Sequence, residues 1–182
     1  DEEGDIDKAT KLYQKSIREY PNSPDAYSNL ASIYIDKLKY EEATILTKKA
    51  ISLKSNFAMA YNNLGTILIR QKKIKEAEKC IKMSIKYNPN NAESQFNQGN
   101  ISFHFGNLLE AERSILKAIE LKKDYSDAYE KLGIILNEQG RAKEALNYIQ
   151  IAIQIQSNKA SYYIRLGFLL SSFNQIHESE KA

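Results

Sequence analysis

The chain has 182 residues, of which 42% are hydrophobic and 27% charged, and its formal net charge is +3. So small a charge does not by itself indicate a nucleic-acid partner, and no stretch approaches the roughly 18 apolar residues of a membrane span. The one cysteine, Cys80, permits a reducing compartment, and the acidic start Asp1-Glu2-Glu3 is unlike that of a signal peptide. We therefore expect a cytoplasmic protein.

A unit of 34 residues repeats along the whole chain without an insertion. Glycine recurs in one register and alanine in another: Gly65, Gly99, Gly133 and Gly167, with Ala43, Ala77, Ala111 and Ala145. A period of this length indicates an array of one small structural unit, whose core is shared between neighbours.

In chain order, residues 1–23 supply only the second half of such a unit. Four complete units follow: residues 24–57, 58–91, 92–125 and 126–159. Residues 160–182 supply a first half and the start of a second. Because both ends fall within a unit and no methionine begins the chain, we expect a single array cut from a longer protein.

Each complete unit predicts two amphipathic helices joined by a turn. In residues 58–91, apolar and small residues recur at helical spacing up to Leu68, Gln71-Lys72-Lys73 interrupt them, and Ala77 resumes the spacing. Asn88-Pro89-Asn90-Asn91 ends the second helix, because proline lacks the amide proton that a helix needs. A second glycine register, Gly4, Gly106 and Gly140, is expected in the turn between the helices.

The repeating positions carry a recognisable pattern of residue types. The first and fourth complete units show it best, with Tyr27, Leu30, Ala31, Tyr34, Ala43 and Ala50 matched by Tyr129, Leu132, Gly133, Leu136, Ala145 and Ala152. This pattern resembles the signature of the tetratricopeptide repeat family. The resemblance implies an all-α fold, a right-handed superhelix (α-solenoid) of helix-turn-helix units, which binds peptides or partner proteins in its concave groove.

No combination of residues indicates an enzyme. His104 and His177 lie in different units, and neither has a second ligand at metal-binding spacing. Cys80 has no neighbouring base that would activate it as a nucleophile, and the repeat accounts for every glycine, so none is left for a phosphate-binding loop. We expect no catalytic residue, no metal and no cofactor.

The resemblance implies that one residue of each first helix, just before the conserved leucine position, faces the groove. These residues are Asn29, Asn63, Asn97, Lys131 and Arg165. A side-chain amide can bond the C=O and the N–H of a bound peptide together, and the row resembles the asparagine ladder in the repeat domain of O-linked N-acetylglucosamine transferases. Alternatively, asparagine is only tolerated on a polar helix face. Lys131 and Arg165 suit an acidic or C-terminal carboxylate end of the ligand.

The 92–125 unit departs from the pattern, because Gln95, Gln98 and Ser102 occupy its buried stripe. A buried glutamine costs about 1 to 3 kcal/mol unless it is paired, so this helix should pack less tightly. Two interpretations of its aromatic residues stay open. In the first, the groove holds an anchor pocket made by Phe96, Asn97, Asn100, Phe103 and His104. In the second, the helix is rotated and its phenylalanines belong to the core.

The 58–91 unit is the most basic, and its second helix carries Lys75, Lys79, Lys82 and Lys86 along one side. Such a strip could bind RNA or anionic lipid, but aromatic residues that would stack on bases do not interleave with it. We interpret it as a solvated outer face, and expect neither a nucleic-acid nor a membrane partner.

The sequence therefore predicts a non-catalytic module that binds an extended peptide or a partner protein. Two alternatives stay open. The chain could be the substrate-recruiting part of a larger enzyme such as a glycosyltransferase, or it could be a scaffold that self-associates through its cut ends or its groove.

Overall fold

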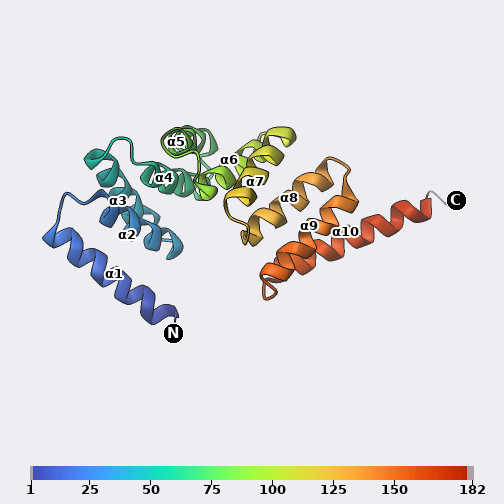
Figure 1. Ribbon diagram of the computed structural model, residues 1–182, viewed down its shortest axis with the longest axis horizontal. Helices are drawn as coiled ribbons and strands as arrows, with labels where there is room; N and C mark the ends of the chain where they lie inside the picture. Colours follow the sequence, from blue (N-terminus) through green and yellow to red (C-terminus); the bar gives the residue numbers. More distant parts are fainter. Residues whose placement is uncertain (1, 180–182) are drawn as a thin grey trace. The chain divides into compact units, whose positions relative to one another are not determined.

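The computed structural model describes residues 2–179, with the side chains of residues 4–171. This part of the chain forms ten α-helices and no strand (Figure 1). The helices are α1 (Glu2–Glu19), α2 (Pro24–Asp36), α3 (Tyr40–Leu53), α4 (Ala58–Arg70), α5 (Ile74–Tyr87), α6 (Ala92–His104), α7 (Leu108–Leu121), α8 (Ser126–Glu138), α9 (Ala142–Ile155) and α10 (Ala160–Ser179). The predicted all-α class is confirmed.

The helices pair as the 34-residue period predicts. Each complete unit contributes a first helix and a second helix that pack on one another: α2 with α3, α4 with α5, α6 with α7, and α8 with α9. Helix α1 stands in the place of a second helix, and α10 in that of a first helix. Helix α10 runs past the register at which the other first helices end.

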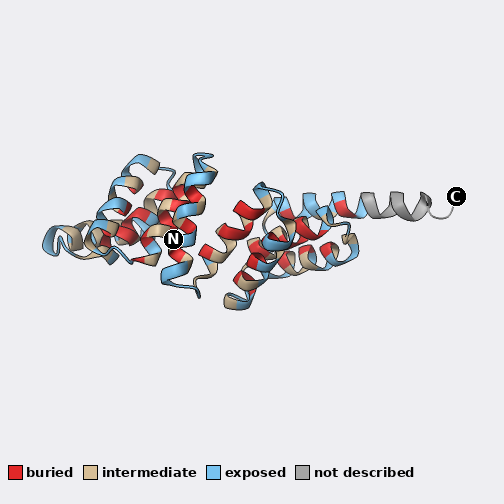
Figure 2. Cartoon of the chain, turned by 90° about the horizontal axis from the view of Figure 1, so that it is seen from above, coloured by how far each residue is buried: buried red, intermediate tan, exposed pale blue. Residues whose placement is uncertain are grey.

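The chain divides into two compact units, Asp1–Pro89 and Asn90–Ala182. The part with α1 to α5 is called the first unit below and the part with α6 to α10 the second unit, whereas the 34-residue units are called repeats. In both, the buried residues, red in Figure 2, form stripes along the helices, and exposed residues lie on the opposite sides. This is the pattern expected when amphipathic helices share a core.

The mid-helix glycines bring the two helices of a pair together. A Cβ atom on Gly65 or Gly99 would lie 2.5 Å from the Cδ1 atom of an isoleucine on the paired helix, and one on Gly133 would lie 2.7 Å away. The isoleucines are Ile81, Ile115 and Ile149, all fully buried. Gly167 differs, because no described atom lies within 4 Å of the place its Cβ would take.

The turns inside the pairs use left-handed backbone at one repeating position. Leu38, Lys72, Gly106 and Gly140 have φ values of 58°, 62°, 76° and 78°. Glycine adopts this conformation without steric cost, whereas leucine and lysine do not. The expectation that Gly4 also lies in such a turn is wrong: it lies inside α1, because no described helix precedes α1 for a turn to join.

Candidate functional site

The first helices of each unit present the face on which the predicted groove residues lie. In the first unit these helices are α2 and α4. Asn29 on α2 is half-buried and lines a shallow hollow of about 460 Å³ against α1, together with Ile6 and Tyr13. Its position leaves it accessible to a ligand on this face.

Asn63 on α4 has a different environment. Only 6% of it is exposed, and its Nδ2 atom donates hydrogen bonds to the backbone oxygen of Ser28, at 2.9 Å, and to the Ser28 hydroxyl, at 3.2 Å. Ser28 is itself fully buried on α2. The amide of Asn63 therefore ties two consecutive first helices together, and a ligand would have to compete with these bonds.

In the second unit the face is made by α6, α8 and α10, with Asn97 half-buried on the first of them. Lys131 on α8 is also half-buried, and its Nζ atom lies 4.9 Å from the centre of the Phe103 ring. Burial lowers the pKa of Lys131 below its ordinary value; the charge of Glu130 opposes this shift, and that of Arg165 adds to it. Arg165 on α10 is exposed, so two cations that influence one another lie on this side of the unit.

The two phenylalanines of α6 are shared between the core and the surface. Phe96 and Phe103 are half-buried and pack against the hydrophobic core of the second unit, and the Phe96 ring lies 5.0 Å from that of Tyr125. Asn100 is half-buried, while His104 is exposed with its ring 5.5 Å from that of Phe105. Of the residues assigned to the anchor pocket, His104 is thus the most open to solvent.

Gln98 occupies the buried stripe, as the sequence predicts, with 7% of it exposed. Its Nε2 atom donates to the Ser102 hydroxyl at 3.2 Å and to Glu110 at 3.3 Å, whereas its Oε1 atom has no partner among the described residues. Because this buried oxygen is unpaired, part of the destabilisation expected from a glutamine at this position remains.

A polar cluster that the sequence analysis missed links α8 to α10. Asp127 accepts a hydrogen bond from the Tyr162 hydroxyl at 2.6 Å and pairs with Lys159. Burial would raise the pKa of Asp127, but the hydrogen bonds from Lys159 and Tyr162 outweigh it and hold the pKa below its usual range. The residues are 32 and 35 positions apart, so no local pattern announces their contact.

Among the described residues, no group of His, Cys, Asp and Glu could hold a metal ion. The side chain of His177 lies outside the described part. Cys80 is half-buried, and burial, followed by the charge of Glu76, raises the pKa of its thiol. This shift disfavours the reactive thiolate. None of the helices that the structure describes is long and apolar enough to cross a membrane.

Comparison with known proteins identifies the repeat. Models of the tetratricopeptide repeat match residues 12–44, 58–91 and 92–125. The solved structure of MamA is 26% identical, with a TM-score of 0.65 over 88% of this chain and 94% of its own. A thermophilic TPR protein of Thermus thermophilus is 22% identical, with a TM-score of 0.74 and coverage of 92% and 91%. YrrB, described as a TPR protein with an unusual peptide-binding site, is 23% identical, with a TM-score of 0.62 and coverage of 88% and 82%. No curated protein matches the sequence.

Proposed function

The chain carries tetratricopeptide repeats, and we propose that it is a non-catalytic module that binds an extended peptide or a partner protein on the first-helix face of its units. Proteins built of such repeats generally act through interaction surfaces, because stacked repeats create extended concave faces. A cytoplasmic setting is part of this proposal.

The observation that carries the proposal is the pair of cations in the second unit. Neither Lys131 nor Arg165 forms a salt bridge with any described residue, although Lys131 is half-buried and its pKa is lowered by burial. Keeping a charge partly out of water without a counter-ion costs free energy. A carboxylate of the ligand would supply that counter-ion, and the guanidinium of Arg165 can bind it through two parallel hydrogen bonds.

The same face offers groups for the rest of the ligand. The amide of Asn97 can bond a peptide backbone, and the ring of Phe103 beside Lys131 gives an apolar surface. Phe96, Asn100 and His104 extend the proposed contact along α6. The ligand that fits best is therefore an extended segment with an acidic side chain or a C-terminal carboxylate.

The asparagine row in the first unit is part of the proposal, but its two members should behave differently. We expect Asn29→Ala to weaken peptides of different sequence by similar factors and to leave folding intact. Asn63→Ala should instead lower the free energy of unfolding by about 1 to 3 kcal/mol, because the backbone oxygen and the hydroxyl of the buried Ser28 lose the hydrogen bonds that Asn63 donates. Urea unfolding and peptide binding of the two variants, measured in parallel, separate these roles.

The cation pair is tested by peptide binding to the double variant Lys131→Gln, Arg165→Gln. Acidic peptides should lose about tenfold or more in affinity, neutral peptides should bind as before, and the salt dependence should flatten. The double variant Arg113→Gln, Lys143→Gln is the charge-matched control, since these exposed cations lie on the second helices α7 and α9. Equal weakening in both variants would mean that the effect is net charge and not a site on this face.

The exposed face of α10 favours the scaffold as a second candidate function. Ile164 and Phe168 are largely exposed there, and among the described residues no atom lies within 4 Å of the Cβ position of Gly167, where the mid-helix glycines of the complete repeats face an isoleucine. Light scattering over a concentration series, on the parent and on Phe168→Glu, tests self-association through this helix. A monomer at all concentrations would exclude it.

A further inference from the structure

A second surface lies on the opposite side of the first unit, where the second helices α1, α3 and α5 follow one another. Two hollows open there, each between two second helices, with a first helix as its floor. The first, of about 500 Å³, lies between α1 and α3 over α2, and the other, of about 650 Å³, lies between α3 and α5 over α4. We call them hollow 1 and hollow 2.

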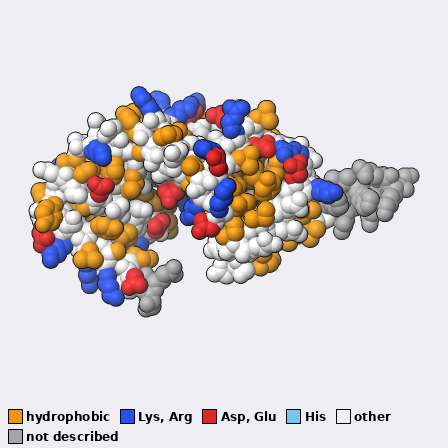
Figure 3. All heavy atoms as spheres, in the orientation of Figure 1, with side chains coloured by type: hydrophobic (Ala, Val, Ile, Leu, Met, Phe, Trp, Pro, Cys, Tyr) orange, Lys and Arg blue, Asp and Glu red, His pale blue; other side chains and the backbone are white. Residues whose placement is uncertain are grey.

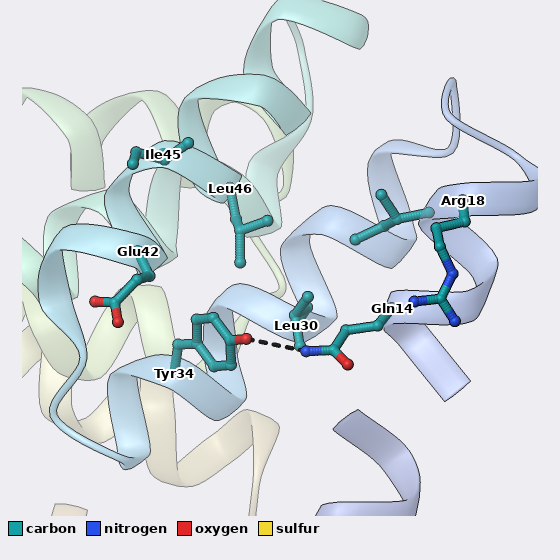
Figure 4. A pocket seen from close by; sticks show the side chains of 8 residues that line it. Gln14, Arg18, Leu30, Tyr34, Glu42, Ile45 and Leu46 are labelled. Carbon is teal, nitrogen blue, oxygen red and sulfur yellow. Dashed lines mark hydrogen bonds between the residues drawn. The ribbon is translucent and has the colours of Figure 1, made fainter. Parts of the chain in front are cut away.

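The two hollows are the same structural feature repeated at the 34-residue period. Leu30, Tyr34 and Glu42 line hollow 1, and the residues 34 positions later, Leu64, Leu68 and Glu76, line hollow 2. In hollow 1, the side chains of Leu30, Tyr34 and Leu46 converge between the helices, with Glu42 on one side and Arg18 on the other (Figure 4). Each hollow thus has an apolar floor and charged edges, as ligand sites commonly have.

Ile45 on α3 lines both hollows and is 69% exposed. The other 34-residue repeats show that the fold does not require an apolar residue at this position. The corresponding residues are all polar or charged: Lys11, Lys79, Arg113 and Asn147. A single exposed apolar residue is ordinary, but one that joins two apolar hollows creates a continuous apolar surface, which marks an interaction site.

In the second unit, polar bonds cross the place that corresponds to hollow 2. Arg141 donates to Glu112 at 2.8 Å, and Gln139 donates to the other oxygen of Glu112 at 2.9 Å, which links α7 to the turn between α8 and α9. The positions 68 residues earlier are Thr44, Gln71 and Lys73, and all three line hollow 2. Thr44 donates instead to the backbone of Tyr40 in its own helix.

A size difference adds to this contrast. Cys80 lines hollow 2, and the corresponding residue of the second unit is the much larger Tyr148, which packs against the core of that unit. The first unit therefore has the small, uncharged residues Thr44 and Cys80 where the second has the carboxylate of the bridge, Glu112, and the aromatic ring of Tyr148. Exposing an apolar surface that could have been closed suggests that a partner covers it.

The charge around hollow 2 indicates the chemistry of that partner. Residues 58–91, which supply its floor and one wall, carry seven Lys or Arg against two Glu. Lys48, Lys73 and Lys79 line the hollow itself, together with Glu41 and Glu76. Lys75, Lys82 and Lys86 are exposed on α5, where Lys82 pairs with Glu78. On the face seen in Figure 3, Lys and Arg side chains lie beside hydrophobic ones in several places, with some Asp and Glu side chains among them. A second copy of this chain would bring another basic face, so charge complementarity favours an acidic partner.

We propose that this second-helix face of the first unit is a docking surface for an acidic, amphipathic segment of a partner protein. Apolar side chains of the segment enter hollows 1 and 2 on either side of Ile45, and its carboxylates pair with lysines of α5. The surface is separate from the first-helix face, so either can exist without the other.

The test uses a phage-displayed library of random 16-residue peptides, selected on the full chain. Selected peptides should combine at least two apolar residues with Asp or Glu, and Ile45→Glu should weaken them about tenfold or more. Leu12→Glu is the matched control, because Leu12 is 66% exposed on α1 and lines neither hollow. Glutamate should be tolerated at position 45, since the same register is polar or charged in every other 34-residue repeat. The thermal unfolding temperature of Ile45→Glu should therefore stay close to that of the parent.

Cys80 is the sole cysteine of the chain, so it reports on hollow 2 directly. A bound peptide should slow the alkylation of Cys80 by N-ethylmaleimide about fivefold or more. These peptides should bind the Lys131→Gln, Arg165→Gln variant as well as they bind the parent, which separates this surface from the first-helix face.

Four results would overturn the proposal. A selection that yields no peptide sensitive to Ile45→Glu would show that the hollows do not dock a segment. Peptides that lose affinity equally in Leu12→Glu, or that leave Cys80 alkylation unchanged, would do the same. Binding of phosphatidylserine vesicles that needs the α5 lysines but not Ile45 would assign the face to lipid instead.

Discussion

The second-helix faces of the two compact units share one backbone register and differ in what fills it. Between α7 and α9, Arg141 and Glu112 bridge the gap, whereas between α3 and α5 the same gap is an open apolar hollow of about 650 Å³. The helices that frame the two places have the same lengths, 13 residues for α4 and α8 and 14 for the second helices. A handful of side chains therefore distinguishes the two places. Interaction surfaces of this kind are carried by positions that the fold leaves unconstrained.

The interiors of the two units, by contrast, should be equivalent. Gly65 and Gly133 each face a fully buried isoleucine that lies too close to leave room for a Cβ atom. We expect Gly65→Leu and Gly133→Leu to lower the free energy of unfolding by about 1 to 3 kcal/mol or more each, because added methylenes overpack the helix pair. Denaturant unfolding gives the size of the loss, and amide hydrogen exchange should locate it in the substituted pair.

Gly167→Leu serves as the control, because no described atom lies within 4 Å of the added Cβ. Its free energy of unfolding should stay close to that of the parent. If the three substitutions lower the free energy of unfolding equally, the close packing of glycine against isoleucine does not distinguish the complete helix pairs from α10.

The turns extend the comparison to the backbone. The first unit places Leu38 and Lys72 at left-handed φ, where the second has Gly106 and Gly140. A non-glycine residue in the left-handed conformation destabilises the fold by about 1 to 2 kcal/mol. Glycine removes this strain but costs about 0.5 to 1 kcal/mol, because it raises the entropy of the unfolded chain. Leu38→Gly and Lys72→Gly should therefore stabilise the first unit by roughly 0.5 kcal/mol, while Gly106→Ala and Gly140→Ala destabilise the second by about 1 kcal/mol.

Thermal unfolding of the four variants checks these signs. Leu38 is largely exposed, so removing its side chain sacrifices little packing. A destabilised Leu38→Gly would show that the leucine makes a contact worth more than the strain of its backbone.

The repeat and its helices were predictable because they follow from short-range periodicity. Spacing alone identified the paired helices and the glycine register that faces Ile81, Ile115 and Ile149. The hydrogen bonds of Asn63 to Ser28 were not predictable, since they join residues 35 positions apart and depend on how two helices pack. Nor did the pattern show the division of the chain between Pro89 and Asn90 into two compact units.

The candidate site shows the same limit. The resemblance to the repeat family implied that Lys131 and Arg165 share one face, but the half-burial of Lys131 against Phe103 emerges only from packing. Ile45 was not singled out from the sequence, although it is the one apolar residue in a register that is otherwise polar or charged. Its meaning depends on the hollows beside it, which only the assembled helices reveal.

The smallest expected change in stability comes from the most direct test of the comparison, a transfer of the bridge. The double variant Thr44→Glu, Lys73→Arg places in hollow 2 the two residue types that meet at Glu112 and Arg141. Partly exposed salt bridges contribute only about 0 to 1 kcal/mol, so the midpoint of unfolding should hardly move. The new pair should instead cover the hollow, slow the alkylation of Cys80, and abolish the binding of peptides that depend on Ile45. Lys73→Arg alone lacks the carboxylate across the hollow that corresponds to Glu112, although Glu76 stands where Glu144 binds Arg141, and it should leave both readouts unchanged. Should the double variant keep the parent's alkylation rate and peptide binding, the difference between the two units would lie in the placement of their helices and not in these side chains.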